Sequence, residues 1–235
     1  MLGRSIVIKR GSKDEGERPF WISFADMMTA MMVLFLLVMS VALLSVTSPS
    51  KQHDEKIQKL CDSIKVAARN DKQGVDVNCE THVINFGAQA QFDSDQYDLK
   101  PNQEQLMRRF VPKVLAIANT KSGQELLKRV VVEGYTDRSG TYLHNLNLSL
   151  QRSQKVLCSL LSDGPKGRAM SAADRADTRR LFLVGGYSSN SSKADKAQSR
   201  RIELRLEFYG VGEETRRGKR TPLIGDVGKC ALPNS

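Results

Sequence analysis

The chain has 235 residues, of which 40% are hydrophobic and 26% charged, a composition typical of a mostly globular protein. Its formal net charge is +10, but the 36 basic residues are mixed with 26 acidic ones, and no basic helix carries interleaved aromatic residues. The composition therefore argues against bulk disorder and against direct nucleic-acid binding.

The first expected element is a membrane-spanning helix over residues 20–46, where a long apolar run holds a single ionisable side chain, Asp26. The run exceeds the roughly 20 residues that cross a bilayer, and it is longer than the roughly 7–15-residue core of a signal peptide. We therefore expect an uncleaved anchor that follows a tail at residues 1–19. Basic residues are only slightly more frequent before the span than after it, so the positive-inside bias is small.

The cysteines give a second indication of compartment. All four lie after the span, and an even number on one side favours an oxidising environment. Three pairings of Cys61, Cys79, Cys158 and Cys230 are possible, and four buried free thiols are the alternative. We expect the N-terminal tail to be cytoplasmic and the remainder to lie outside the inner membrane, in a bacterial periplasm.

Residues 47–81 are predicted to form a linker that contains an amphipathic helix. Pro49 removes an interior helix hydrogen bond, which predicts that the spanning helix ends within residues 45–50. Beyond it, apolar residues recur at spacings of three and four, a pattern typical of a helix with one buried stripe. These residues are Ile57, Leu60, Cys61, Ile64 and Ala68.

Residues 82–210 contain short apolar segments separated by turns and helices. This alternation predicts a two-layer α/β sandwich in which helices cover one face of the sheet. Pro112 is a potential kink in the first of these helices. Strands are expected at 82–86, 129–134, 181–186 and 201–208, and helices from about residue 101 and over about 147–161.

The last expected strand alternates cleanly between apolar and charged residues. Arg200 shares the parity of the apolar set, so it should lie at the strand's end on the helix-covered side, whereas Arg201 has the opposite parity. The polar segment 211–235 is interpreted as a tail that a disulfide through Cys230 can pin.

Asp137 and Arg152 are the candidate binding residues of this domain. Asp137 follows the second strand and Arg152 lies in the next helix, and Gly140 in the polar turn between them lets the chain fold back. A carboxylate beside a guanidinium can bind a zwitterion, because the first takes an ammonium and the second a carboxylate. On spacing alone, a surface salt bridge is the stronger interpretation.

Four ordered segments within about residues 82–208 resemble the motifs of the OmpA-like peptidoglycan-binding domain: "GYTDRSG", "LHNLNLSLQRSQKVL", "VGGYSSN" and "SRRIEL". The resemblance implies that Asp137 and Arg152 hold the zwitterionic end of diaminopimelate in a cell-wall stem peptide. It also implies a set of residues that shape the pocket or add charge to it: Thr136, Asn145, Leu148, and Arg200 or Arg201. The sequence departs from the family pattern at four positions, with His144 in place of Tyr, Ser153 of Ala, Tyr187 of Gly and Ser199 of Asn.

Asp26 raises the second functional question. One carboxylate in a span costs roughly 2.5–3.5 kcal/mol, and the apolar residues around it outweigh that cost. Asp26 lies about 9 Å inside Phe20 by helical rise, so it should face a partner helix or a wet cavity. Ser23, Thr29 and Ala30 on its face are small enough for another helix to approach. A titrating proton carrier and a polar contact that holds helices together are equally compatible with these facts.

The segment "FADMMTAMMVLFLLVM" resembles the single transmembrane helix of the B subunits of ion-driven stators, the flagellar MotB type. The resemblance implies that Asp26 carries protons. It also implies a homodimer whose helices sit inside a ring of a multi-span, MotA-like A subunit. The short interval between span and domain most resembles the ZorB family of the Zorya anti-phage defence system, which implies a ZorA-like partner.

Two other interpretations stay open from the sequence: a flagellar MotB-type stator subunit, and a passive tether between wall and membrane. An enzyme is not expected, because no nucleophile and base pair, metal-ligand spacing or phosphate loop stands out. The three histidines are scattered and are interpreted as surface residues. The sequence accordingly predicts no metal and no cofactor.

Overall fold

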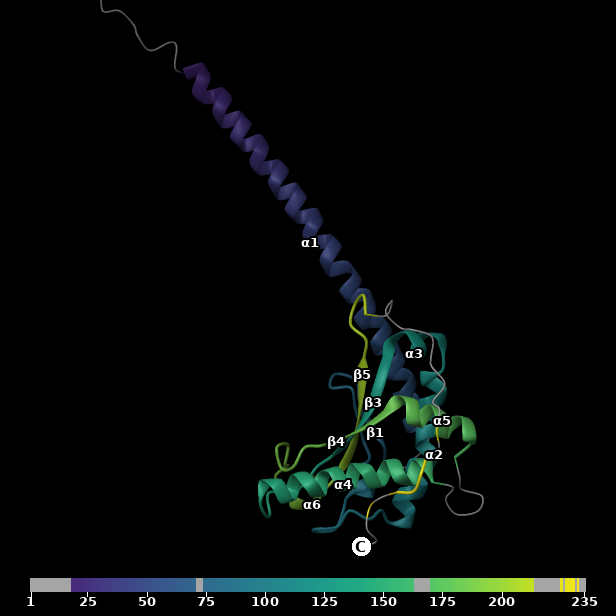
Figure 1. The fold of residues 1–235 in the computed structure, drawn as a ribbon. Coiled ribbons are helices and arrows are strands. Elements are labelled where there is room, and N and C mark those ends of the chain that lie inside the picture. The colour runs from purple at the N-terminus through teal and green to yellow at the C-terminus, as the bar shows by residue number, and fades with distance from the viewer. Residues whose placement is uncertain are drawn as a thin grey trace, which may run out of the picture. The chain divides into compact units, whose positions relative to one another are not determined.

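The computed structural model describes residues 18–70, 74–162, 170–213, 225, 227–230 and 232. Most of the expected tails at 1–19 and 211–235 lies outside the described residues. The chain divides into two compact units, Met1–Lys51 and Gln52–Ser235, and the second unit contains the sheet (Figure 1).

Helix α1 spans Arg18–Arg69. Its apolar side chains from Trp21 to Leu44 are exposed, and within the described residues α1 is the one helix long and apolar enough to cross a membrane, by length and composition. The prediction that this helix ends near Pro49 is wrong. A proline removes one backbone hydrogen bond, and the segments on both sides of Pro49 have helical patterns of their own, so the helix continues across it.

The second part of α1 belongs to the domain rather than to a separate linker. All five residues of the expected apolar stripe are buried in the same core as the sheet, from Ile57 to Ala68. The compact unit accordingly begins at Gln52, well before the boundary at residue 82 that the sequence predicted. The sequence also missed β1 (Asp76–Asn78), which lies within the predicted linker.

The sheet has five strands in the order β1-β2-β5-β3-β4. β3 and β4 are parallel and the other neighbours are antiparallel. In the register of β3 with β5, Gly134 lies opposite Ile202, so the end of β3 lies beside the start of β5. The four predicted strands are confirmed as β2 (Val83–Asn85), β3 (Leu127–Gly134), β4 (Phe182–Gly186) and β5 (Ile202–Phe208).

Helix α2 (Pro101–Ala118) runs on through Pro112, and α4 (Tyr142–Leu161) begins earlier than predicted. The early start of α4 has a local cause, because the Thr141 side chain accepts a hydrogen bond from the His144 backbone N–H and caps the helix. The sequence did not predict the remaining short helices, which are η1 (Gly87–Ala90), α3 (Lys121–Leu126), α5 (Ala172–Leu181) and α6 (Lys196–Ser199).

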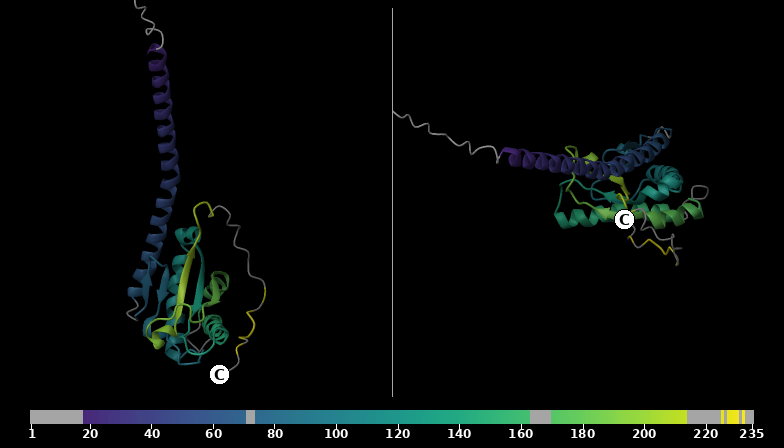
Figure 2. Two further views of the ribbon diagram at one scale, coloured as in Figure 1. Left: turned by 90° about the vertical axis from the view of Figure 1, so that its left-hand side faces the viewer. Right: turned by 90° about the horizontal axis from the view of Figure 1, so that it is seen from above.

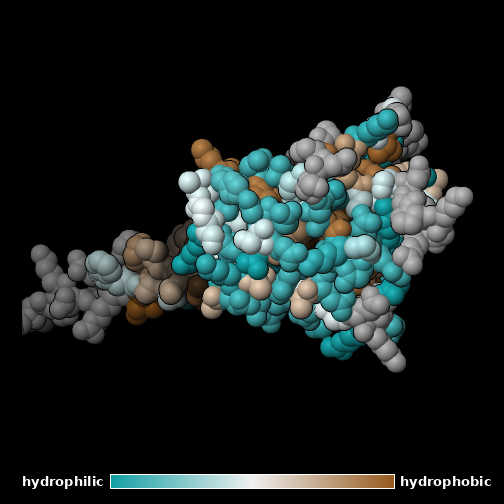
Figure 3. All heavy atoms as spheres, turned by 90° about the horizontal axis from the view of Figure 1, so that it is seen from below, coloured by the Kyte–Doolittle hydropathy of each residue, from teal (hydrophilic) through white to brown (hydrophobic). Residues whose placement is uncertain are grey.

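The core lies between one face of the sheet and the helices. Ile202, Leu204 and Leu206 alternate inward from β5 and are buried together with Phe110 of α2 and Val156 of α4. Helix α4 packs on β3 and β4, and Figure 2 shows α4 and α5 together on one side of β5. The end of the domain seen in Figure 3 is largely hydrophilic, as expected for a surface in an aqueous compartment.

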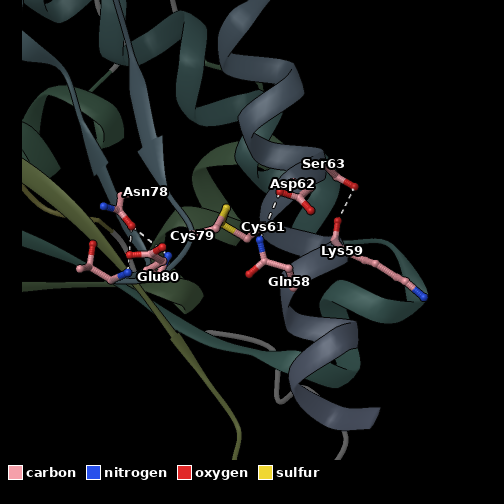
Figure 4. Close-up of a disulfide and its surroundings, with 9 residues drawn as sticks. Gln58, Lys59, Cys61, Asp62, Ser63, Asn78, Cys79 and Glu80 are labelled. Carbon is pink, nitrogen blue, oxygen red and sulfur yellow. Dashed lines mark hydrogen bonds between the residues drawn. A yellow bond between two sulfur atoms is a disulfide. The ribbon is translucent and has the colours of Figure 1, made fainter. Parts of the chain in front are cut away.

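The four cysteines, whose pairing the sequence left open, form two disulfides. Cys61 of α1 pairs with Cys79, which directly follows β1, so the helix is covalently joined to the edge of the sheet (Figure 4). Cys158 of α4 pairs with Cys230 in the C-terminal segment. The prediction of disulfide bonds is confirmed, and the alternative of four free thiols is wrong.

Candidate functional site

A pocket of about 230 Å³ lies at the C-terminal end of β3. Its walls come from the loop before α2, the turn after β3, helix α4 and Arg200, which directly follows α6. We call it the charged pocket, because Asp137 faces two guanidinium groups there. Six residues predicted from the sequence line it: Thr136, Asp137, Asn145, Leu148, Arg152 and Arg200.

Gly134, the last residue of β3, lets α4 lie close to the strand that leads into the pocket. A Cβ atom at this position would lie 2.0 Å from the carbonyl oxygen of Ser149 and 2.6 Å from Oγ of Ser153, so glycine is required. The Ser153 hydroxyl also donates to the carbonyl of Gly185 at 2.7 Å, which fastens α4 to β4. This close packing brings Arg152, on the same helix, to the turn that carries Asp137.

Asp137 is buried, and both of its carboxylate oxygens accept hydrogen bonds. Oδ1 accepts from the Ser139 backbone N–H at 2.8 Å, and Oδ2 accepts from Nη1 of Arg200 at 2.9 Å. Burial opposes ionisation, but the Ser139 N–H and the Arg200 guanidinium outweigh it and hold the pKa of Asp137 below its ordinary value. The group is therefore an anion at neutral pH, and its ion-pair partner is Arg200 rather than Arg152.

The side chain of Arg152 is fully buried and makes three hydrogen bonds to backbone carbonyls. Nε donates to Gln96 at 2.8 Å, Nη1 to Tyr135 at 2.8 Å and Nη2 to Asp93 at 3.1 Å. Burial, with Arg200 nearby, lowers the pKa of Arg152 to about 10, so it stays protonated at neutral pH. Among the described residues these contacts leave one N–H on each terminal nitrogen for a ligand.

Thr136 and Asn145 complete the polar lining. The Asn145 side chain donates to the carbonyls of Asp137 and Ser139, at 3.3 Å and 2.8 Å, and so fixes the turn. The hydroxyl of Thr136 is buried and has no hydrogen-bond partner within the part of the chain that the structure describes. An unpaired buried hydroxyl is costly, so this oxygen marks a position where a polar ligand atom fits. Leu148 supplies apolar lining.

His144 and Asp95 face each other at the rim of the pocket. Nε2 of His144 lies 2.7 Å from Oδ1 of Asp95, and both side chains are about half exposed or more. The sequence interpretation left His144 as a scattered surface residue and did not single out Asp95. The two residues lie far apart along the chain, and no local pattern connects them.

Arg201 does not line the charged pocket, which corrects one of the two alternatives at this position. Its Nε donates to Oε1 of Glu203 at 2.8 Å, and its guanidinium lies 4.2 Å from the ring centroid of Tyr135. The reason is strand parity: Arg201 has the parity of the charged residues of β5, and Arg200 that of the core residues.

The pocket presents the buried carboxylate of Asp137, two guanidinium groups and an unpaired hydroxyl within a small volume, with the exposed carboxylate of Asp95 at its rim. An ammonium can lie against Asp137, and a carboxylate can lie against Arg152 and Arg200, so the arrangement suits a zwitterion. Among the described residues, no group of three His, Cys, Asp or Glu side chains could hold a metal ion.

Asp26, the other predicted functional residue, lies in the apolar part of α1 in the first unit. The hydroxyl of Thr29 donates a hydrogen bond to the backbone carbonyl of Asp26 at 2.8 Å, so this hydroxyl already has a hydrogen-bond acceptor within its own helix. The charged pocket and Asp26 thus belong to separate units of the chain.

Comparison with known proteins places Asp26 and Asp137 within matches to two different families. Residues 8–67 match the family described as Membrane MotB of proton-channel complex MotA/MotB, and residues 91–193 match the OmpA family. The probable lipoprotein YiaD of Escherichia coli K12 is 32% identical over 53% of this chain and 50% of its own length. A solved structure of a putative MotB-like protein from Desulfovibrio vulgaris is 17% identical, with a TM-score of 0.44, over 68% of this chain and 96% of that chain.

The two family matches define the class: a MotB-like membrane segment followed by an OmpA-family domain, a class without enzymatic activity. The Zorya protein ZorB of Escherichia coli O139:H28 is 42% identical over 91% of this chain and 90% of its own length. The chain belongs to the ZorB family.

Proposed function

We propose that this chain is the B subunit of a proton-driven motor of the bacterial inner membrane, anchored to peptidoglycan and active in anti-phage defence. The observation that carries the proposal is the combination, in one chain, of Asp26 in an apolar helix and a zwitterion-sized charged pocket in an OmpA-family domain. The N-terminus lies in the cytoplasm and the domain in the periplasm, where its two disulfides persist.

The charged pocket holds the zwitterionic end of diaminopimelate in a stem peptide. The ligand ammonium lies against Asp137, and its carboxylate takes the remaining N–H groups of Arg152 with added charge from Arg200. The unpaired hydroxyl of Thr136 gives the ligand one further polar partner. Because these groups are buried and already oriented by backbone contacts, little order is lost when the ligand binds.

Asp26 carries protons between the two sides of the membrane. Two copies of the span lie within a ring of a multi-span A subunit, and the domain holds the dimer fixed to the wall. A proton that falls through about 100 mV releases about 2.3 kcal/mol. Neutralising Asp26 changes which contacts with the ring are favourable, so proton passage can turn the ring around the fixed dimer.

The identity of 42% to a Zorya protein supports the defence role over a flagellar one. A passive tether, in which Asp26 is only a polar contact, is the rival that needs a direct test. Asp26→Asn keeps the shape of the side chain and removes its titration, so it should assemble with the A subunit and lose phage protection. Asp26→Glu still titrates and should keep part of the activity.

The measurement pairs copurification of the A subunit with phage plating on cells that carry the whole system. Ser40→Ala is the matched control and should keep assembly and protection, because within the described residues the Ser40 hydroxyl bonds only the Leu36 carbonyl of its own helix, at 2.7 Å. Full protection by Asp26→Asn would end the motor proposal and leave the tether, because an amide can still hydrogen-bond between helices.

A further inference from the structure

The turn that carries Asp137 is supported from the far side of the sheet by a cluster of charged and aromatic side chains. We call it the outer-face cluster, since its members lie on β3 and β5 or one residue beyond the ends of β3, β4 and β5, with the parity opposite to that of the core residues. Its members are Glu133, Tyr135, Tyr187, Arg201 and Arg205. Tyr135 and Arg201 are buried, and Glu133 has no exposed surface.

Tyr135 connects this cluster to the charged pocket. Its side chain belongs to the cluster, whereas its backbone carbonyl accepts the hydrogen bond from Nη1 of Arg152 at 2.8 Å. Its backbone N–H donates to the carbonyl of Arg201 at 3.0 Å. Arg152 is held by three backbone carbonyls, and the position of the Tyr135 backbone determines the position of one of them.

The ring of Tyr135 is fixed by several contacts within the outer-face cluster. Its hydroxyl donates to Oε2 of Glu133 at 2.8 Å, and the other oxygen of Glu133 accepts from Nε of Arg205 at 2.6 Å. The Arg201 guanidinium lies 4.2 Å from the ring centroid. The ring of Tyr187 stacks on it with centroids 5.3 Å apart and an interplanar angle of 26°. Stacked aromatic pairs of this kind are favourable and fix relative orientation.

Tyr187 is the member of the cluster that the family pattern does not predict, because glycine is expected there. Its ring needs space on β4, and Gly185 provides it: a Cβ atom at Gly185 would lie 3.2 Å from Cε2 of Tyr187. The Tyr187 backbone N–H donates to the Gly134 carbonyl at 3.0 Å, which ties it to the end of β3. Tyr187 does not line the charged pocket, so it does not contact a ligand held there.

We propose that Tyr187 is a positioning residue for stem-peptide binding: its ring holds the Tyr135 ring in place, and the Tyr135 carbonyl thereby holds Arg152 in its binding orientation. The proposal rests on the proposed function of the charged pocket. The orientation of the Arg152 guanidinium depends on the positions of backbone carbonyls, because all its hydrogen bonds within the described chain are to such carbonyls. The ligand carboxylate then forms the ion pair with Arg152.

The test uses the full chain in detergent and the soluble tripeptide L-Ala-D-Glu-meso-diaminopimelate as the probe. Tyr187→Ala should weaken tripeptide binding about tenfold, by analogy with metal sites, where removing a residue that orients a ligating side chain costs about 10–100-fold in affinity. Tyr187→Phe keeps the stacked ring and should bind within about twofold of the unaltered protein. Leu183→Ala, which shortens an exposed apolar side chain of β4, is the matched control and should leave affinity unchanged.

A second readout reports on Arg152 without any ligand. In protein labelled with ¹⁵N-arginine, the Nε–Hε signal of Arg152 is identified by its loss in Arg152→Lys. This signal should move in Tyr187→Ala and stay in place in Tyr187→Phe and Leu183→Ala. Affinity is measured at a temperature where circular dichroism finds every variant folded, so a loss of stability alone does not change it.

The proposal is overturned if Tyr187→Ala binds the tripeptide like the unaltered protein, or if Leu183→Ala weakens binding equally. Its failure is distinct from failure of the proposed function, which is indicated when Asp137→Ala binds the tripeptide as well as the unaltered protein does. If the proposed function fails in this way, the Arg152 Nε–Hε signal is the only remaining test of the positioning role. An unchanged signal in Tyr187→Ala would then contradict that role.

Discussion

The disulfide between Cys61 and Cys79 should account for a large share of the domain's stability. It joins α1 to the residue that follows β1 and closes a loop with a sequence separation of 18 (Figure 4). In the chain-entropy treatment, a loop of this length contributes about 3 kcal/mol to the free energy of unfolding. Whole domains have only about 5–15 kcal/mol, so replacing both cysteines by alanine should be strongly destabilising.

The expected effect on melting follows from the size of the unit. For domains of about 150–250 residues, each kcal/mol shifts Tm by about 2–4 °C, so Cys61→Ala with Cys79→Ala should lower Tm by about 6–12 °C. The assay is thermal unfolding of the full chain in detergent, followed by near-ultraviolet circular dichroism. Tripeptide binding at 25 °C should not change, because neither cysteine lines the charged pocket.

Ile64→Val is the matched control for this prediction. It keeps the disulfide and removes one methyl group from the same buried stripe, at a cost of about 1 kcal/mol. The reasoning is refuted if the double alanine variant melts within about 2 °C of the unaltered protein. It is also refuted if Ile64→Val is the more damaging change, because the apolar stripe would then hold α1 without help from the disulfide.

Three further predictions concern the sheet, the loop before β2 and the charged pocket. Gly134→Ala should lower Tm sharply or prevent folding, because the added Cβ meets the Ser149 carbonyl at 2.0 Å; a variant that melts normally would contradict the close packing of α4. Burial and the nearby Arg205 lower the pKa of His82, so its contribution to stability is present above about pH 6.5 and is lost as pH falls through the lowered folded pKa. Tm should therefore decline on acidification to pH 5, and less steeply in His82→Asn, which tolerates the positive φ of this residue; equal slopes would rule out His82 as the cause. The lowered pKa of Asp137 keeps this carboxylate charged to pH values below the ordinary carboxyl pKa of about 4, so binding to peptidoglycan sacculi should be constant from pH 7 to 5. Arg200→Ala removes the ion-pair partner of Asp137, so the loss of binding on acidification should then begin at a higher pH. A pH profile of binding that Arg200→Ala leaves unchanged would refute the ion pair.

The sheet could be predicted from the sequence because its strands carry a strong period-two or continuous apolar signal. β5 alternates over its whole length, and β3 contains three consecutive valines. β1 could not be predicted in the same way, since its three residues are Asp, Val and Asn and only Val77 is buried. Helix α5 could not be predicted from the sequence for a similar reason: only Thr178 and Leu181 in it are buried, so it has no apolar stripe.

The candidate site was predicted residue by residue, but its internal pairing was not. Motif order identified Asp137 and Arg152, and strand parity placed Arg200 on the correct side of β5. The ion pair between Asp137 and Arg200 depends on the register of β3 with β5, which spacing along the chain does not encode. The same holds for Tyr135 and Tyr187, whose stacking follows from the parallel pairing of β3 with β4.

Binding of two stem tripeptides to the same full-length protein tests the central claim most directly. L-Ala-D-Glu-meso-diaminopimelate and L-Ala-D-Glu-L-Lys both carry a side-chain ammonium, and only the first carries the carboxylate that Arg152 and Arg200 would hold. Leaving buried guanidinium N–H groups unpaired costs about 1–3 kcal/mol, so calorimetry should find the lysine peptide about 10–100-fold weaker. Equal affinity for the two peptides, or equal affinity of Asp137→Ala and the unaltered protein for the first, would contradict the zwitterion pocket.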